Sequence, residues 1–315
     1  MQLFQNILYV SLGINDEVSG LKQALDLAGK NAAHLTILLL TPELPGNLAD
    51  YREKFESAVI QDMQSALAKA ADSLNIDTNA IDYSIMLDHD TKPAIRTIRT
   101  VLKHGHNLVI KEATTRQDNR GFRSIDMSLL RKCPCPVWLC RPIAKPHKDI
   151  NLAVAIDPGD EEGEAVELSK QMLEMASTLS DSYSGYLQIV ACWDYEYEAF
   201  LRHNPWAPVP EHKIQDALRL SQSEHRERLT TLTEKAGIPD GAHHQVNQLH
   251  GRPDTLIPQF VEDHDIDILV MGTLARTGIP GITIGNTAEN ILQTLSSFLL
   301  ALKPSGFVTP VKAND

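Results

Sequence analysis

The sequence lacks the features that mark several specialised classes of protein. It has four cysteines in 315 residues, and Cys192 lies far from the other three, so it carries no disulfide framework of a small secreted domain. It has no apolar run approaching the roughly 18 residues that cross a membrane. Residues 1–13 lack the basic start and apolar core of a signal peptide. We therefore expect a cytoplasmic protein without a membrane span.

Positive charge is also scarce. The sequence has 29 Lys and Arg residues against 41 Asp and Glu residues, for a formal net charge of −12. Such a chain repels a phosphate backbone at long range, so we expect no nucleic-acid partner. A small anion can still bind, because helix N-termini and loop amides attract anions without adding formal charge.

Common catalytic and metal-binding motifs are missing as well. There is no Gly-x-Ser-x-Gly elbow, no Gly-Lys-Ser/Thr phosphate loop and no His-Glu-x-x-His pair. Cys133-Pro-Cys135 has no second pair at zinc spacing, which favours buried structural thiols. His243, His244 and His250 fall on an expected strand, where adjacent side chains point to opposite faces. The sequence therefore predicts no catalytic residues and no metal site.

The sequence does contain a repeated alternation of strands and helices. In the first half we expect strands at 6–12, 33–40, 81–87, 107–111 and 136–141, and helices at 16–29, 48–74, 92–104 and 126–132. In the second half we expect strands at 151–157, 185–193, 243–249, 267–273 and 298–303, and helices at 161–179, 211–237, 253–264 and 287–295. The two halves follow the same order, which indicates an internal duplication.

This repetition predicts two domains, as the length also suggests. We place the first at 1–142, a linker at 143–148 around Pro146, and the second at 149–315. Near-continuous apolar strands alternating with helices predict an α/β class in which each domain is a doubly wound parallel sheet covered on both faces. In such sheets ligands bind beyond the C-terminal strand ends, where the strand order reverses.

The most informative segment is 271–289, a glycine-containing loop between an expected strand and an expected helix. Its glycines, which include Gly272 and Gly285, let a ligand approach the backbone closely. A strand, such a loop and a helix N-terminus in this order can surround an anion with amide groups. The segment predicts a phosphate site.

Each candidate ligand residue also has a purely structural interpretation. Asn286 could cap the following helix, with Glu289 completing a capping box and no ligand present. Arg276 could hold a phosphate with two hydrogen bonds or be a solvated loop cation. Asp157 could face a ligand at its strand end or simply begin a turn.

An aromatic segment follows the second strand of the second half. It contains Trp193, Tyr195, Tyr197, Phe200 and Trp206. Because it borders the expected pocket, it could form a lid or an apolar wall for a ligand. It could equally be a hydrophobic patch that closes a long loop.

These segments resemble the universal stress protein family, in particular its tandem two-domain subgroup, universal stress protein E. The family signature is Gly, two residues, Gly, nine residues, Gly, then Ser or Thr. Here Gly272, Ala275, Gly285 and Asn286 stand at those places, so the spacing fits while Ala replaces the second Gly and Asn replaces Ser or Thr. Residues 129–138 are similar to the end of the subgroup's first domain.

The resemblance implies a strand order of 3-2-1-4-5 in each five-stranded sheet and pairing of the two domains through their fifth strands. It also implies ATP or AMP as the ligand, with the metal requirement unknown. Carried over by position, the ligand-binding residues would be Asp157, Cys192, Met271, Gly272, Thr273, Ala275, Arg276, Gly285, Asn286 and Thr287. Asp157 and the backbone near Cys192 would meet adenine and ribose, and the others would surround the phosphates.

The first half has no equivalent loop. Glu112 stands where Gly272 stands in the second half, and Ser124-Ile125-Asp126 precedes the fourth helix. A carboxylate at that position should repel a nucleotide, so we expect the first half to be a structural partner.

We therefore expect a tandem universal stress protein that acts in stress resistance by binding rather than by catalysis. One alternative is a binder of another phosphate-containing, partly apolar ligand, and another is a weak ATPase. Pairing of the two domains within one chain would form the usual dimer internally, and further dimerisation is left open.

Overall fold

The computed structural model describes residues 3–13, 18–113, 121–141, 150–159, 163–203, 208–238, 243–273 and 284–313. The expected linker at 143–148 lies outside these residues. The chain forms two compact units, and each is described by itself.

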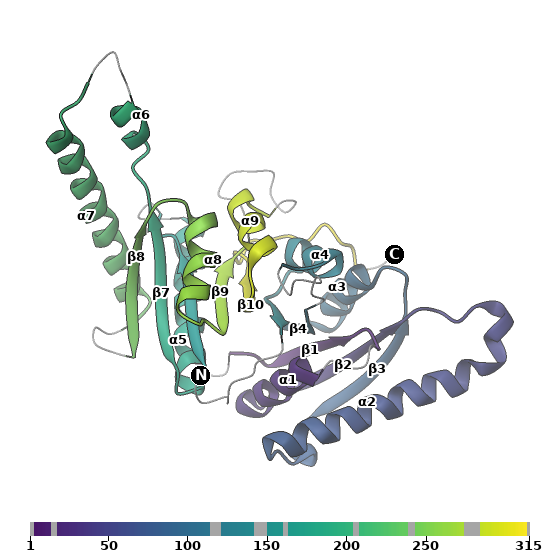
Figure 1. Ribbon diagram of the computed structural model, residues 1–315. Helices are drawn as coiled ribbons and strands as arrows, with labels where there is room; N and C mark the ends of the chain where they lie inside the picture. The colour runs from purple at the N-terminus through teal and green to yellow at the C-terminus, as the bar shows by residue number, and fades with distance from the viewer. Residues whose placement is uncertain are drawn as a thin grey trace. The chain divides into compact units, whose positions relative to one another are not determined.

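The first unit contains the first half of the chain and its last strand (Figure 1). Its strands are β1 (Asn6–Ser11), β2 (His34–Thr41), β3 (Tyr83–His89), β4 (Leu108–Glu112), β5 (Val137–Cys140) and β10 (Phe298–Leu302). Its helices are α1 (Val18–Asn31), α2 (Arg52–Leu74), α3 (Pro93–His104) and α4 (Ser124–Lys132), with short 3-10 turns η1 (Gly46–Tyr51) and η2 (Thr78–Ala80).

The helix ends of the first unit follow from local sequence. Pro93 opens α3, where a missing amide costs nothing. Gly105 ends α3 with a left-handed φ of 69°, and Asn75 ends α2 with a φ of 55°, the two residue types that tolerate this backbone best.

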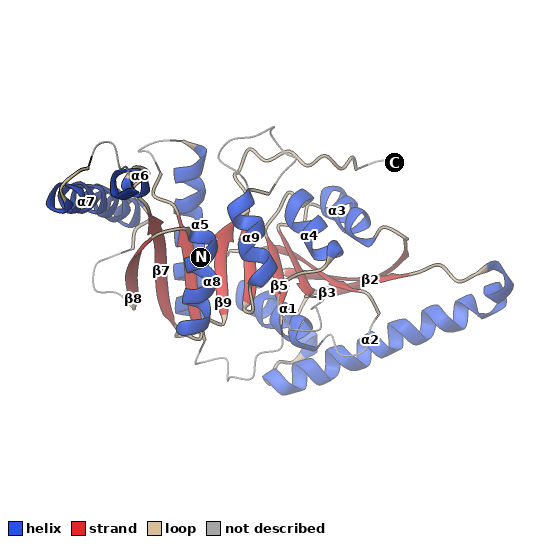
Figure 2. Cartoon of the chain, turned by 45° about the horizontal axis from the view of Figure 1, so that its top comes forward, coloured by secondary structure: helices blue, strands red, loops and turns tan. Residues whose placement is uncertain are grey.

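The sheet of the first unit runs β3-β2-β1-β4-β5-β10. The first five strands are parallel, in the order that the family resemblance implies, and β10 pairs antiparallel with β5 through Leu300 opposite Trp138. Helices α1 and α2 cover one face and α3 and α4 the other (Figure 2). The central strands are almost fully apolar and buried, as a sheet covered on both faces requires.

The second unit contains strands β6 (Asn151–Ile156), β7 (Tyr186–Trp193), β8 (His244–His250) and β9 (Ile268–Gly272). Its helices are α5 (Glu164–Ser182), α6 (Glu198–His203), α7 (Glu211–Lys235), α8 (Pro253–Asp263) and α9 (Asn286–Thr294). The parallel order is β9-β6-β7-β8, with α5 packed beside α7 and α8 beside α9.

The α/β class with its parallel sheet and repeated βα order is therefore confirmed. Most expected elements are present, with ends displaced by a few residues. Helix α6 was not expected, because six residues are too few to show a helical period. None of the helices in the described part of the chain combines the length and apolar character that crossing a bilayer requires.

The compact units do not coincide with the two sequence copies. Strand β10 ends the second copy but belongs to the first unit, where it is paired with β5. The boundaries 1–142 and 149–315 describe the repeat in the sequence and stay a prediction for independently folding domains.

Candidate functional site

The strand order reverses between β6 and β9 in the second unit. Strand β6 has β7 on one side and β9 on the other, and the register sets Ala155 opposite Met271. Asp157 directly follows β6, and Gly272 ends β9. Both therefore lie at the C-terminal edge, where doubly wound sheets bind ligands.

Asp157 has both a turn role and an exposed carboxylate. Its Oδ1 accepts a hydrogen bond from the Gly159 amide at 3.0 Å, and its carbonyl accepts one from the Ser169 hydroxyl at 3.0 Å. Gly159 has a φ of +55°, so glycine suits this tight turn. Asp157 therefore takes part in a turn, and its side chain remains exposed at the strand end.

Gly272 packs against helix α5. A Cβ atom built there would lie 3.0 Å from the Leu168 Cδ2 atom. Met271, one residue earlier, is buried. Helix packing therefore gives Gly272 a structural reason of its own, in addition to the ligand approach expected from the sequence.

The N-cap position of α9 carries no capping side chain. Gly285 is the N-cap residue, and Asn286 is the first helical residue. The alternative interpretation in which Asn286 caps the helix is therefore wrong, because Asn286 already lies within the helix. The exposed first turn, with Asn286 and Thr287, keeps amide donors that an anion can use.

The remaining predicted residues are placed differently. Cys192 lies one residue beyond the last β6–β7 pair, Ile156 with Ala191, and burial raises the pKa of its thiol to about 11. Thr273 is buried, and its hydroxyl donates to the Leu302 carbonyl at 3.4 Å. Ala275 and Arg276 lie outside the described residues.

The corresponding place in the first unit is filled by its own side chain. Strand β4 pairs with β1 in the same register in which β9 pairs with β6, so Glu112 and Gly272 occupy matching positions. A Glu112 carboxylate oxygen accepts a hydrogen bond from the Gly20 amide, in the first turn of α1, at 2.5 Å. A carboxylate of the chain thus occupies a helix N-terminus, where anions are stabilised.

A buried ion pair lies beside it. The Lys111 Nζ atom is 3.0 Å from Asp126 Oδ1, with side chains that are 1% and 0% exposed, and it also donates to the Glu112 carbonyl at 2.6 Å. The matching positions in the second unit are Met271 and Ala288, both buried and apolar. The sequence identified Glu112, but it did not indicate that Lys111 and Asp126 pair.

The aromatic segment after β7 is partly a packing element. Trp193 is buried with Ile214 and Leu218 of α7, and Tyr195, Leu201 and Val209 pack on this cluster. Tyr197 and Phe200 remain exposed, and Trp206 lies outside the described residues. The side chains of Trp193 and Tyr195 therefore match the interpretation of a hydrophobic patch that closes a long loop.

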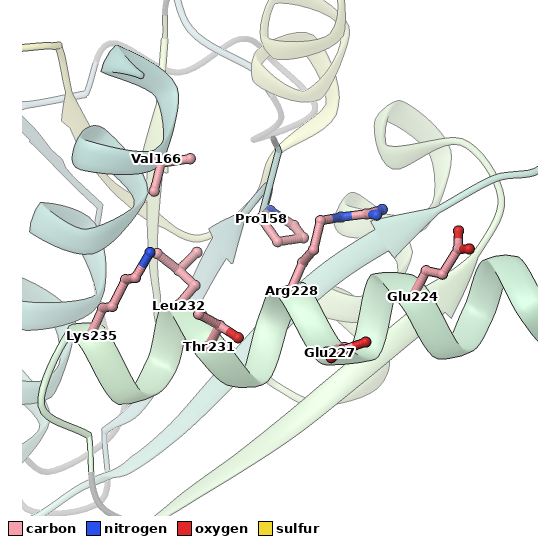
Figure 3. A pocket seen from close by; sticks show the side chains of 8 residues that line it. All are labelled: Pro158, Val166, Glu224, Glu227, Arg228, Thr231, Leu232 and Lys235. Atoms are coloured by element: carbon pink, nitrogen blue, oxygen red, sulfur yellow. The ribbon is translucent and has the colours of Figure 1, made fainter. Parts of the chain in front are cut away.

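A cavity of about 570 Å³ lies next to the β6 end (Figure 3). Pro158 and Val166 line one side and α7 the other; its described α7 lining residues are Glu224, Glu227, Arg228, Thr231, Leu232 and Lys235. Sequence reasoning assigned no role to these α7 residues, because charges along a long helix usually mark only a solvated face.

The thiols of the first unit are buried, as expected for structural cysteines. Cys133 Sγ lies 3.6 Å from Cys135 Sγ, and Cys140 is also buried. The nearby Lys303 ammonium is buried too, and this burial lowers its pKa to about 8.

Comparison with known proteins gives a consistent picture. The profile described as "Universal stress protein family" matches residues 3–141 and 151–302. The chain is 28% identical to universal stress protein E of Escherichia coli strain K12, over 100% of this chain and 99% of that one. It is 25% identical to universal stress protein E of Photorhabdus laumondii, over 99% of both chains. A solved structure of a functionally unknown protein from Pseudomonas aeruginosa PAO1 is similar with a TM-score of 0.73, at 25% identity, over 96% of this chain and 94% of that one.

Proposed function

Because the chain belongs to the universal stress protein family and carries its domain twice, we propose that it binds a nucleotide, ATP or AMP, in its second half. The ligand lies at the C-terminal edge of β6 and β9. Its phosphates meet the first turn of α9, and its nucleoside lies toward Asp157 and the backbone near Cys192. The protein acts in the stress response through this binding rather than through a reaction.

One contrast between the two halves carries the proposal. In the first unit Glu112 closes a helix N-terminus and Lys111 pairs with Asp126. In the second unit the matching positions are Gly272, Met271 and Ala288, so neither that carboxylate nor that ion pair is present there. The N-cap residue of α9 has no capping side chain, as is also true of α4, the matching helix of the first unit. Helix N-termini left open beside a glycine at a sheet switch point favour phosphate.

Two further features of the chain support the proposed pairing of its domains and the proposed cytoplasmic location. Strand β10 of the second half pairs antiparallel with β5 of the first, which supports pairing of the two domains within one chain. Cys133, Cys135, Cys140 and Cys192 are all free thiols, which supports a reducing, cytoplasmic location.

Equilibrium dialysis against ATP and AMP, without added metal, tests the ligand. The informative variant is Thr287→Glu, because its carboxylate would compete with phosphate at the first turn of α9. The matched control is Thr294→Glu, since Thr294 is an exposed threonine at the other end of the same helix. We expect Thr287→Glu to weaken nucleotide binding about tenfold or more, and Thr294→Glu to bind like the wild type.

The same samples separate the alternatives. Phosphate release from bound ATP, above that of a Gly285→Glu control, would make the protein a weak ATPase. Absence of nucleotide binding, together with a co-purified compound in native mass spectrometry, would support a different phosphate-containing ligand. The mixed-charge cavity between Pro158 and α7 is a second place to seek such a compound. Equal nucleotide affinity in both glutamate variants would contradict the proposed position.

A further inference from the structure

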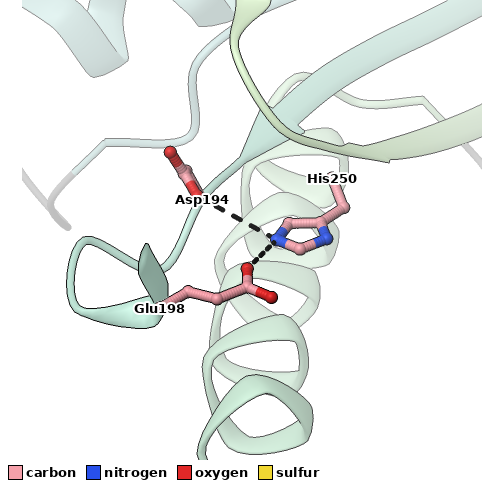
Figure 4. Close-up of side chains that lie close together, drawn as sticks. All are labelled: Asp194, Glu198 and His250. Carbon is pink, nitrogen blue, oxygen red and sulfur yellow. Dashed lines mark ion pairs between the residues drawn. The ribbon is translucent and has the colours of Figure 1, made fainter. Parts of the chain in front are cut away.

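Three metal-ligand side chains gather where β7 and β8 end (Figure 4). Asp194 follows β7, Glu198 opens α6, and His250 ends β8. The His250 Nε2 atom lies 3.1 Å from Glu198 Oε2 and 4.0 Å from Asp194 Oδ1. One ligand atom from each residue lies within 4.8 Å of the others. This group shares no residue with the proposed nucleotide site, and Asp194 lies two residues after Cys192 along the chain.

The histidine ring is held in place by its neighbours. The Trp193 ring stacks on the His250 ring, with a centroid distance of 4.3 Å and an interplanar angle of 19°. Trp193 is itself packed against α7, and its carbonyl accepts from the Gly251 amide at 2.8 Å. A ring fixed in this way presents its Nε2 atom toward the two carboxylates without further ordering.

Glu198 is oriented as well. Its Oε1 atom accepts from Arg202 Nε at 2.9 Å, and Arg202 Nη1 donates to both Glu211 carboxylate oxygens at 2.8 Å. The Oε2 atom is left directed at His250. Metal-ligand carboxylates are usually held by such outer hydrogen bonds.

The charge balance favours a bound cation over a simple ion pair. Asp194, Glu198 and Glu211 bring three carboxylates to this place, and Arg202 brings one guanidinium. Three carboxylates outweigh one guanidinium even if His250 is protonated, so this group is negatively charged, and a divalent ion would offset that charge. The side chains of Asp194, Glu198 and His250 are 59%, 21% and 41% exposed, so water can complete the coordination.

We propose that Asp194, Glu198 and His250 bind a divalent transition-metal ion, of which Zn²⁺ is the representative. The imidazole nitrogen favours such an ion over Mg²⁺ or Ca²⁺, which take oxygen ligands almost exclusively. Bonds of about 2.0–2.2 Å from Zn²⁺ to N and O place two tetrahedral ligand atoms about 3.3 Å apart. The Glu198–His250 separation already matches this distance, and Asp194 needs a small rotation away from its hydrogen bond with the Tyr195 amide.

Binding of the ion ties α6 to the ends of β7 and β8. Helix α6 has six residues and is otherwise held by Leu201 on the Trp193 cluster and by the Arg202–Glu211 pair. Three bonds to one ion would limit opening of this helix. The sequence did not indicate the site because the histidine and the two carboxylates come from separate segments of the chain.

Titration of the metal-stripped full chain with Zn²⁺, followed by calorimetry, tests the proposal. The variants are His250→Ala and Glu198→Gln. The matched control is His243→Ala, since His243 is also exposed but precedes the other end of β8, about 20 Å away along the strand. We expect one Zn²⁺ per chain whose affinity falls about tenfold or more in the two site variants and is unchanged in the control.

Hydrogen exchange gives a second readout that a purely structural ion pair would not change. Zn²⁺ should slow exchange of the amides at 198–203 in the wild type and in His243→Ala, but not in His250→Ala. Zn²⁺ affinity equal in His250→Ala and the wild type would overturn the proposal. Equal losses in His243→Ala and His250→Ala would do the same, because they would indicate unspecific binding to surface histidines.

Discussion

Glu112 and Gly272 occupy matching positions with opposite consequences. Glu112 fills its place and bonds to the Gly20 amide, whereas Gly272 leaves its place without a side chain and lets Leu168 of α5 approach. In the first half the glycine, Gly20, is in the helix and the larger residue, Glu112, is at the strand end. In the second half the glycine, Gly272, is at the strand end and the larger residue, Leu168, is in the helix. The second half therefore has no carboxylate at this position of its switch point.

The Lys111–Asp126 pair gives the first prediction at the residue scale. Substituting Lys111→Met should lower the free energy of unfolding by about 3–5 kcal/mol, because it leaves the Asp126 carboxylate buried without its cation. The double variant Lys111→Met/Asp126→Ala copies Met271 and Ala288 and should recover most of that loss. Urea denaturation measures both; a single variant as stable as the wild type would rule out the buried pair as a determinant of stability.

His106 gives a second prediction, in the pH dependence of stability. Burial lowers the pKa of His106 to about 4, from a usual value of 6.5. Between these values the unfolded chain binds a proton that the folded chain excludes, so this contribution is complete above about pH 6.5 and is lost as the pH falls toward 4. We expect His106→Gln to remove on the order of 1–3 kcal/mol of the stability difference between pH 7 and pH 4.

The matched control for this effect is His243→Gln, because His243 is an exposed histidine that belongs to the second unit. In denaturation curves at several pH values, the free energy of unfolding of the control should depend on pH as that of the wild type does. If the free energy of unfolding of His106→Gln depends on pH as that of the wild type does, other groups cause the acid sensitivity.

Individual residues could be predicted from the sequence only where the backbone order fixed their place. Asp157, Gly272 and Glu112 follow directly from the ends of strands, so their positions were foreseeable. The partner of Lys111 and the hydrogen bond from Thr273 to Leu302 depend on packing between distant segments. No local pattern encodes those contacts.

At the element scale, the proposed phosphate position depends on the first turn of α9. Its N-cap residue, Gly285, offers no side-chain acceptor, so a carboxylate in this turn should stabilise the helix and, under the proposed function, compete with phosphate. We expect Thr287→Glu to raise the free energy of unfolding by about 0.3–1 kcal/mol without ligand, and Thr294→Glu to lower it by a similar amount. Thermal unfolding without nucleotide compares them; a Thr287→Glu variant less stable than Thr294→Glu would contradict an open N-terminus.

The elements themselves were largely predictable. Long periodic helices such as α2 and α7, and apolar strands such as β1 and β9, carry strong local signals. Helix α6 has no such signal, and the sequence left open whether Asn286 is a cap, because a cap residue and a first helical residue differ only in backbone conformation. The backbone conformation at the start of α9 therefore required the structure.

At the scale of the whole molecule, the pairing of β5 with β10 determines whether β5 has an open edge. Strand β10 covers the edge of β5 inside one unit, so β5 does not offer an open edge to another chain. The family resemblance predicted pairing of the fifth strands within one chain and left further dimerisation open. The strands alone could not distinguish pairing within a chain from pairing between chains, because both arrangements bury the same residues.

Truncation before Ser297 tests this pairing. Without β10, the β5 edge is open, and we expect concentration-dependent association in sedimentation experiments. Removal of 304–315 alone keeps β10 and should leave the sedimentation of the full chain unchanged. A folded truncated chain, identified by circular dichroism, that sediments as the intact one does would show that β10 does not protect that edge.

The asymmetry between the two halves is tested most directly by calorimetric titration of the full chain with ATP and AMP. We expect one nucleotide per chain, with binding weakened by Thr287→Glu and retained by Thr294→Glu. Two nucleotides per chain, or one whose affinity is the same in both variants, would contradict it.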